Sequence, residues 1–135
     1  MTDPTMAAGD ALPDIERTLG AADLVAYAGA TWDWNRLHYD HDYLTDRGLP
    51  GPVVDGQMFG ALLVEQVQDW LGPQARVTAM GFRYAAMVFA GETVTVRGEV
   101  ESVEDGVIRV RQRIEASGEP DKLAIKDAWI EAVLA

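Results

Sequence analysis

Residues 57–71 read QMFGALLVEQVQDWL, and this stretch decides the fold. Its first half is apolar around most of a helical circumference, as expected of a helix inside a domain. Gly72 and Pro73 follow it and would stop the helix. Asp55, a residue type favoured at the N-cap, stands just before it. The sequence therefore predicts a long buried helix over 57–71 that Asp55 caps.

The sequence after this helix changes to the two-residue alternation of half-exposed strands. Apolar and polar side chains alternate over 93–100 and 108–114. Turn-forming residues at 104–106 and 118–121 separate these segments and precede a last strand from about 123 to 134. With a further strand over 75–89, we expect an antiparallel meander of about four strands. One buried helix followed by such strands predicts an α+β fold, a single domain in which an antiparallel sheet wraps around a long central helix.

The residues before the central helix predict two short helices and an irregular loop. Residues 21–30 have helical spacing of their larger apolar groups, whereas 31–40 follow neither the helical nor the strand period. Asp40 is expected to cap a second helix over 41–47, which Gly48 would end. Residues 1–12 are small, polar and acidic, so we expect a flexible N-terminal arm there and the folded domain over 13–135.

Composition narrows the class of protein. The chain has 135 residues, 48% of them hydrophobic, which suits one domain with a real core. It contains no cysteine, so a disulfide framework, a thiolate nucleophile and a thiolate metal site are excluded. The formal net charge of -11 disfavours nucleic acid and anionic membranes as partners. Without a basic N-terminal region or a long apolar run, we expect a cytoplasmic protein.

The irregular loop carries the residue types of acid–base chemistry. Asp33, Asn35, His38 and Asp40 lie within eight residues of one another. Asp33 and His38 are the pair suited to moving a proton, and on a helix they would point about 140° apart. Only a looped backbone can aim both at one ligand. The loop therefore predicts a candidate catalytic pair.

A second candidate element is Asp55-Gly56 at the start of the central helix. Glycine lets a ligand oxygen come close to the backbone. The free N–H groups at a helix N-terminus also favour a developing negative charge. We therefore expect an oxyanion site at the Gly56 N–H.

With these elements in place, the sequence resembles the MaoC-like and (R)-specific enoyl-CoA hydratases of the hot-dog superfamily. Their motif, Asp-x-Asn-x-x-His-x-Asp, matches Asp33-Trp34-Asn35-Arg36-Leu37-His38-Tyr39-Asp40 at all four specified positions. The resemblance covers roughly residues 20–100, including Phe82-Arg83-Tyr84 and the stretch 88–93. It implies that the wrapped sheet is a hot-dog domain. Two departures stand out: Arg36 occupies the family's proline position and Asp55 its histidine position.

The resemblance implies a hydratase or dehydratase acting on an enoyl or (R)-3-hydroxyacyl thioester. Asp33 and His38 would activate water, Asn35 would orient the pair, and the Gly56 N–H would polarise the thioester carbonyl. No metal or redox cofactor would be needed, because the substrate is itself a thioester of coenzyme A or a carrier protein. Further candidate substrate-binding residues, for which plain packing remains the alternative, are Trp32, Trp34, Met58, Phe59 and Arg83.

Two other functions remain open. A hot-dog thioesterase would place its carboxylate on the central helix, where Glu65 and Asp69 are the only acids well inside. A non-catalytic subunit would bind acyl groups or pair with a second hot-dog protein. We expect a homodimer formed by edge-to-edge pairing of sheets. A heteromer is the alternative, because the charge of -11 favours a more basic partner for the coenzyme phosphates.

Overall fold

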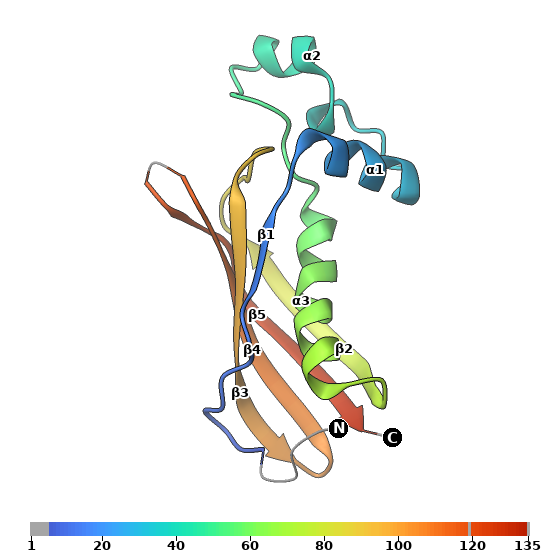
Figure 1. Ribbon diagram of the computed structural model, residues 1–135, viewed down its shortest axis with the longest axis vertical. Helices are drawn as coiled ribbons and strands as arrows, with labels where there is room; N and C mark the ends of the chain where they lie inside the picture. The colour runs from blue at the N-terminus through green and yellow to red at the C-terminus, as the bar shows by residue number, and fades with distance from the viewer. Residues whose placement is uncertain (1–5, 119, 135) are drawn as a thin grey trace.

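A five-stranded antiparallel sheet curls around one long helix in the computed structural model, which describes residues 6–118 and 120–134 (Figure 1). The strand order is β1-β3-β4-β5-β2. The predicted fold class, an antiparallel sheet wrapped around a central helix, is confirmed. The elements in chain order are β1 (Ile15–Thr18), α1 (Ala21–Thr31), the 3-10 helix η1 (Arg36–His38), α2 (His41–Asp46), α3 (Gly56–Leu71), β2 (Ala75–Tyr84), β3 (Thr93–Glu104), β4 (Val107–Ala116) and β5 (Lys122–Leu134).

The central helix α3 begins and ends as its sequence predicts. The Asp55 side chain accepts a hydrogen bond from the Gln57 N–H at 3.0 Å, and Gly72 ends the helix at a positive φ of 88°. The side chains that α3 buries in the sheet's concave face are Phe59, Leu62, Leu63, Gln66, Val67 and Leu71. Among the described residues, no helix combines the length and the apolarity needed to cross a membrane.

The sheet differs from the predicted meander at both of its edges. Strands β3, β4 and β5 follow one another as expected, but β2 pairs with β5, and β1 pairs with β3. The strand expected over 75–89 ends at Tyr84, because Phe89 instead forms a bridge with Val53. The short strand β1 was not predicted, since its four residues, IERT, have too little apolar alternation to signal a strand.

The described part of the N-terminal segment forms hydrogen bonds with β3, and the expectation that this arm is flexible stays a prediction. Residues 1–5 lie outside the described part. The Gly9 N–H donates to the Val100 carbonyl at 2.8 Å, and the Leu12 N–H donates to the Gly98 carbonyl at 2.9 Å. Leu12 is buried in the core. Residues 9–12 therefore run along β3 because one apolar side chain anchors them, a signal that the polar composition of this segment hides.

Two buried amides tie the middle of α3 to the sheet. Gln66 Nε2 donates to the carbonyls of Pro13 and Val96, both at 3.0 Å. Gln112 Nε2 donates to the Leu63 carbonyl and to Gln66 Oε1, both at 2.9 Å. Gln66 and Gln112 are buried. The amide N–H groups that α3 and β4 bury are thus satisfied by backbone carbonyls and, for Gln112, also by the Gln66 side chain.

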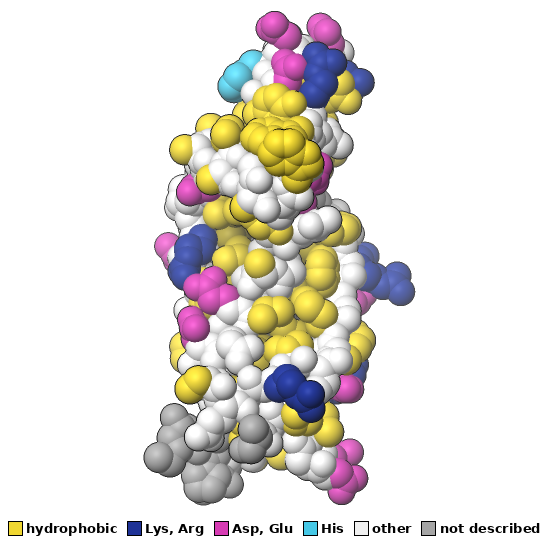
Figure 2. Space-filling model, turned by 90° about the vertical axis from the view of Figure 1, so that its right-hand side faces the viewer, with side chains coloured by type: hydrophobic (Ala, Val, Ile, Leu, Met, Phe, Trp, Pro, Cys, Tyr) yellow, Lys and Arg dark blue, Asp and Glu magenta, His cyan; other side chains and the backbone are white. Residues whose placement is uncertain are grey.

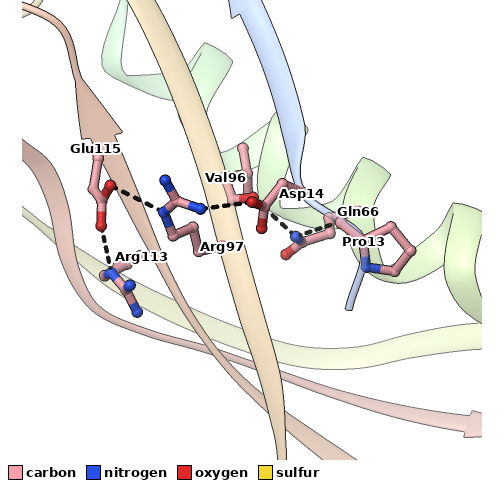
Figure 3. A network of polar contacts seen from close by, with 7 residues as sticks. All are labelled: Pro13, Asp14, Gln66, Val96, Arg97, Arg113 and Glu115. Atoms are coloured by element: carbon pink, nitrogen blue, oxygen red, sulfur yellow. Dashed lines mark hydrogen bonds and ion pairs between the residues drawn. The ribbon is translucent and has the colours of Figure 1, made fainter. Parts of the chain in front are cut away.

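The outer face of the sheet is held by ion pairs. Arg97 contacts Asp14 at 2.6 Å and Glu115 at 3.0 Å, and Glu115 also contacts Arg113 at 2.8 Å (Figure 3). Figure 3 shows this chain of charges beside the Gln66 contacts, with β3 between them. Exposed pairs of this kind contribute about 0–1 kcal/mol each. They pair the arginines of β3 and β4 within the fold, so these side chains are engaged without a ligand.

Candidate active site

Three side chains from separate segments meet at the N-terminal end of α3. They are Asp33 after α1, His38 at the end of η1, and Asp55 at the N-cap of α3. One ligand atom of each lies within 4.8 Å of the others. The two residues of the predicted pair, Asp33 and His38, are therefore brought together, and a third acid joins them.

The backbone around Asp33 explains how the loop aims its side chain. Trp32 adopts a left-handed conformation with φ 58° and ends α1, while the Asp33 N–H still donates to the Ala28 carbonyl at 3.0 Å. Asn35 Oδ1 accepts from the Leu37 N–H at 3.0 Å and so starts η1. Asn35 thereby shapes the loop backbone between Asp33 and His38, and its contacts are with that backbone.

The His38 ring is buried and its tautomer follows from its partner. Its Nδ1 lies 2.6 Å from the Val53 carbonyl oxygen, which can only accept a hydrogen bond. Nδ1 therefore carries a hydrogen, and Nε2 is the atom that faces the cluster, 3.7 Å from Asp55 Oδ2. A neutral imidazole in this tautomer presents a free lone pair at Nε2, as a general base requires.

The two carboxyl oxygens of Asp55 have different surroundings: one caps α3, and the other faces the cluster. Oδ1 caps α3 through the Gln57 N–H, whereas Oδ2 is buried with no hydrogen-bond partner among the described residues. Burial raises the pKa of Asp55, and the neighbouring Asp33 carboxyl raises this pKa further. The Gln57 N–H and the charge of His38 act in the opposite direction. The predicted cap is confirmed, but it accounts for only half of this carboxyl group.

Gly56 is the first residue of α3 and lies beneath the ring of Tyr84. A Cβ at this position would lie 2.7 Å from Tyr84 Cζ and 2.8 Å from its hydroxyl oxygen, so any side chain here would require the Tyr84 ring to move. No acceptor for the Gly56 N–H is found in the described part of the chain. Glycine thus lets Tyr84 close over the helix end while the N–H stays available to a ligand oxygen.

Two tyrosines that the sequence analysis missed border the cluster. Tyr84 comes from the end of β2, and Tyr27 from α1. Burial raises the pKa of Tyr27, and Asp55, Tyr84 and Asp33 add to this increase. Phe82 and Tyr84 are two residues apart and so lie on the same face of β2, while Gly56 and Gly60 are four residues apart and so lie on the same face of α3. Tyr84 packs on Gly56, and Phe82 packs on Gly60. This matched spacing of aromatic and glycine residues is the signal that could have identified Tyr84.

An apolar groove opens beside the cluster, with a volume of about 860 Å³. His38 and Gly56 lie at its edge. Lys122, a charged side chain in its lining, is paired with Glu92 at 2.8 Å. The segment after β2, residues 85–89, forms one wall of this groove. Its main apolar lining residues are Val54, Phe59, Tyr84, Met87, Val88 and Phe89.

The predicted substrate-binding residues divide into different places. Phe59 lines the groove, while Met58 packs against the core. Trp32 and Trp34 stack edge to face at 5.8 Å outside the groove lining, and Trp32 is 79% exposed. The Arg83 side chain is 75% exposed and also lies outside the groove lining. Of these five, only Phe59 faces the groove directly.

The acids considered for a thioesterase lie away from the groove. Glu65 forms an ion pair with Arg17 at 2.5 Å, and Asp69 is exposed on α3. Neither is part of the groove lining.

The cluster of Asp33, His38 and Asp55 also has the spacing of a site for a divalent cation. A chelator control therefore belongs in any assay.

Comparisons with known proteins identify the family of this chain. A family model described as MaoC like domain matches residues 5–119. The 3-oxo-4,17-pregnadiene-20-carboxyl-CoA hydratase beta subunit of Mycobacterium tuberculosis is 33% identical over 103 residues, covering 76% of this chain and 80% of the relative. The (R)-specific enoyl-CoA hydratase of Aeromonas caviae is 26% identical over 95 residues, covering 67% of this chain and 69% of the relative.

A solved structure supports the same assignment. A chain of the ChsH1-ChsH2 complex from Mycobacterium tuberculosis superposes with a TM-score of 0.84 at 28% identity, covering 97% of this chain and 99% of that chain. The curled sheet around α3 is the hot-dog fold. Since the family model spans most of the sequence and the Mycobacterium tuberculosis relative matches across three quarters of it, the chain belongs to the MaoC-like domain family.

Proposed function

We propose that the protein adds water to an enoyl thioester, or removes it from an (R)-3-hydroxyacyl thioester. The observation that carries this proposal is the meeting of Asp33 and His38 beside the Gly56 N–H at the edge of an apolar groove. An acid–base pair and an oxyanion donor are the parts that such a reaction needs. The names of the two hydratase relatives support the same reaction class.

In the proposed reaction, a water molecule lies between Asp33 and His38. One of these groups accepts a proton from the water while the other delivers a proton to the α-carbon, and both act on one face of the substrate. The Gly56 N–H and the α3 dipole stabilise the negative charge that develops on the thioester oxygen. All of these groups belong to the chain itself, so the proposal includes no metal or redox cofactor.

The shape of the groove favours a bulky apolar acyl group. Its lining is mostly apolar and it is open along one side, which admits a wide group as readily as a linear chain. A relative named for a pregnadiene carboxyl-CoA substrate is consistent with such a ligand. For the coenzyme, Arg83 is the candidate phosphate contact, because it is exposed next to Tyr84 and its ion pair with Asp127 is long, at 3.9 Å.

We also propose that the protein works as a dimer through the edge of β2. This strand has a hydrogen-bonded neighbour, β5, on one side only. Apolar side chains gather over α1 and along the adjoining α3 face (Figure 2), and partly buried ones include Val64, Met80 and Phe82. A homodimer is the simpler assembly. A heteromer with a more basic hot-dog subunit is the alternative that the net charge and the ChsH1-ChsH2 relative favour.

The test is turnover of a panel of enoyl thioesters by the purified protein, followed by the absorbance of the conjugated enoyl group. We expect hydration that Asp33→Asn and His38→Gln abolish, that a chelator leaves unchanged, and that Glu65→Gln leaves intact. Release of free thiol that depends on Glu65 would favour a thioesterase instead. A folded protein that turns over no thioester, alone or with a co-purified partner, would contradict the proposal and favour a non-catalytic subunit.

A further inference from the structure

Asp55 is the one buried acid of the cluster to which the proposed reaction gives no part. The whole residue is 7% exposed, and its Oδ2 has no hydrogen-bond partner among the described residues. That oxygen points to His38 Nε2 at 3.7 Å. A cap alone requires one oxygen, which Oδ1 supplies. A buried carboxyl oxygen without a donor costs about 1–3 kcal/mol, so its retention calls for a functional reason.

The titratable groups around Asp55 limit the functions that its unpaired oxygen can have. The titratable groups that face it are Asp33 after α1, His38 of η1, and the tyrosines Tyr27 of α1 and Tyr84 of β2. No Lys or Arg in the described part forms an ion pair with it. His38 is therefore the one group that can become a cation beside two carboxyl groups. Two carboxylates this close are stable together only if the cluster also holds a proton or a positive charge.

We propose that Asp55 is a positioning residue that keeps a proton on Nε2 of His38, so that His38 serves as the acid and Asp33 as the base. This inference rests on the proposed hydratase function, in which the two roles were still interchangeable. The Asp55 carboxylate faces Nε2 and stabilises the imidazolium, while the Val53 carbonyl holds the Nδ1 hydrogen on the other side of the ring. Asp33, half-buried, remains free to take the proton of water.

With these roles, every proton that moves in the hydration step has a donor and an acceptor. The water oxygen forms a bond to the β-carbon as one O–H bond breaks, and that proton passes to the Asp33 carboxylate. The electron pair of the carbon–carbon double bond moves toward the carbonyl oxygen at the Gly56 N–H. The resulting enolate takes the Nε2 proton of His38 at the α-carbon. Return of the Asp33 proton to His38 restores the cluster, and the net change is the addition of one water.

Kinetics over a range of pH test this role. Asp55→Asn keeps the cap and the shape but removes the charge, and Asp55→Ser keeps the cap but cannot reach His38. We expect the high-pH limb of the hydration kcat/KM profile to move to lower pH by about 1 unit or more in both variants. Asp23→Asn is the matched control, because Asp23 is a capping acid of α1 at which the same charge is lost. Its profile should coincide with that of the wild type.

A second measurement does not depend on activity. The carboxyl carbon of Asp55 can be followed by NMR, with Asp55→Asn identifying its signal. We expect its titration to move to higher pH in His38→Gln, because the stabilising cation is lost, and to lower pH in Asp33→Asn, because the neighbouring acid is lost.

The two measurements separate the possible failures. Superimposable pH profiles for wild type and Asp55→Asn would overturn the proposal, as would an Asp55 titration that does not respond to His38→Gln. The latter result would place the proton between the two carboxyl groups. If no thioester is hydrated but the Asp55 titration shifts as expected, the paired proton stands and the hydratase function fails.

Discussion

Helix α3 carries two buried polar clusters that differ in one respect. In the middle of the helix, Gln66 and Gln112 are neutral, both donate to backbone carbonyls, and Gln112 also donates to Gln66. At its start, Asp33, His38 and Asp55 are ionisable, and Asp55 Oδ2 has no donor in the described structure. The first cluster holds the fold because its donors match acceptors. The second cluster leaves hydrogen-bonding atoms without partners in the protein, so these atoms are available to a ligand. This lowers the free energy of unfolding.

The match in the middle cluster is nearly complete rather than perfect. Gln112 Oε1 also lacks a partner among the described residues. It is a neutral amide oxygen, whose desolvation costs less than that of a carboxylate. The comparison therefore predicts that changes in the middle cluster affect stability, whereas changes at the helix start affect activity.

The largest expected effect is on activity at the helix start. Asp33→Asn and His38→Gln should each lower kcat/KM for enoyl hydration by roughly 100- to 10,000-fold, because each removes a proton-transfer group. Urea unfolding of Asp33→Asn should remain close to that of the wild type, since Asp33 is half-buried. A loss of activity matched by a loss of folded protein would break the comparison.

The next effect is on stability in the middle of the helix. Gln66→Ala should lower the free energy of unfolding by about 2–4 kcal/mol, since it removes the hydrogen bonds of Gln66 to two backbone carbonyls and to Gln112 and opens a cavity. Urea titration measures this change, and Gln57→Ala, an exposed glutamine of the same helix, is the control. The activity of each folded molecule should be retained. A kcat that falls with stability would show that the two clusters are coupled.

A smaller effect is expected where Tyr84 covers the helix start. Gly56→Ala should lower kcat by roughly 10-fold, because the new methyl group displaces the Tyr84 ring beside the Gly56 N–H. Tyr84→Ala in the same chain should restore part of the rate by removing the clash. Gly60→Ala, whose Cβ would lie 3.3 Å from Phe82, is the milder control. Equal losses for both glycines would point to helix packing instead of the carbonyl site.

The smallest effect is a gain in stability. Asp55→Asn should raise the free energy of unfolding at neutral pH by about 1 kcal/mol, since a neutral amide replaces a buried carboxylate and keeps the cap. The pKa of Asp55 is raised in the folded chain, so the wild type gains stability as pH falls through this pKa. The advantage of the variant should therefore shrink as pH falls from neutral toward the ordinary carboxyl value of 3.8. Urea unfolding at both pH values checks the sign.

Much of the fold follows from local patterns in the sequence. The apolar circumference of α3, the glycine after it and the alternation of β3 and β4 all act within short windows, and the observed elements fall where they were expected. The pairing of β2 with β5 did not follow, because an edge partner is chosen by contacts distant in sequence. The strand β1 and the contact of residues 9–12 with β3 were not predicted because each segment contains few apolar side chains.

The site, like the fold, was predictable where it depends on residues close together in the sequence. The spacing of Asp33 and His38 indicates one loop, and Gly56 follows from its place at the helix start. The orphaned oxygen of Asp55 could not be foreseen, since capping explains an aspartate at that position fully until its surroundings are known. The same holds for Tyr84, whose ring reaches Gly56 only because β2 lies against α3.

The position of the end of β5 offers a practical use of this geometry. Strand β5 ends beside the C-terminal end of α3 (Figure 1), where Leu134 pairs with Ala75. The reacting groups lie at the N-terminal end of this helix. A helix of 16 residues spans about 24 Å. A tether attached beyond β5 therefore leaves the protein on a sensor surface or bead with the groove directed toward the solution, so ligand capture can be measured without obstruction.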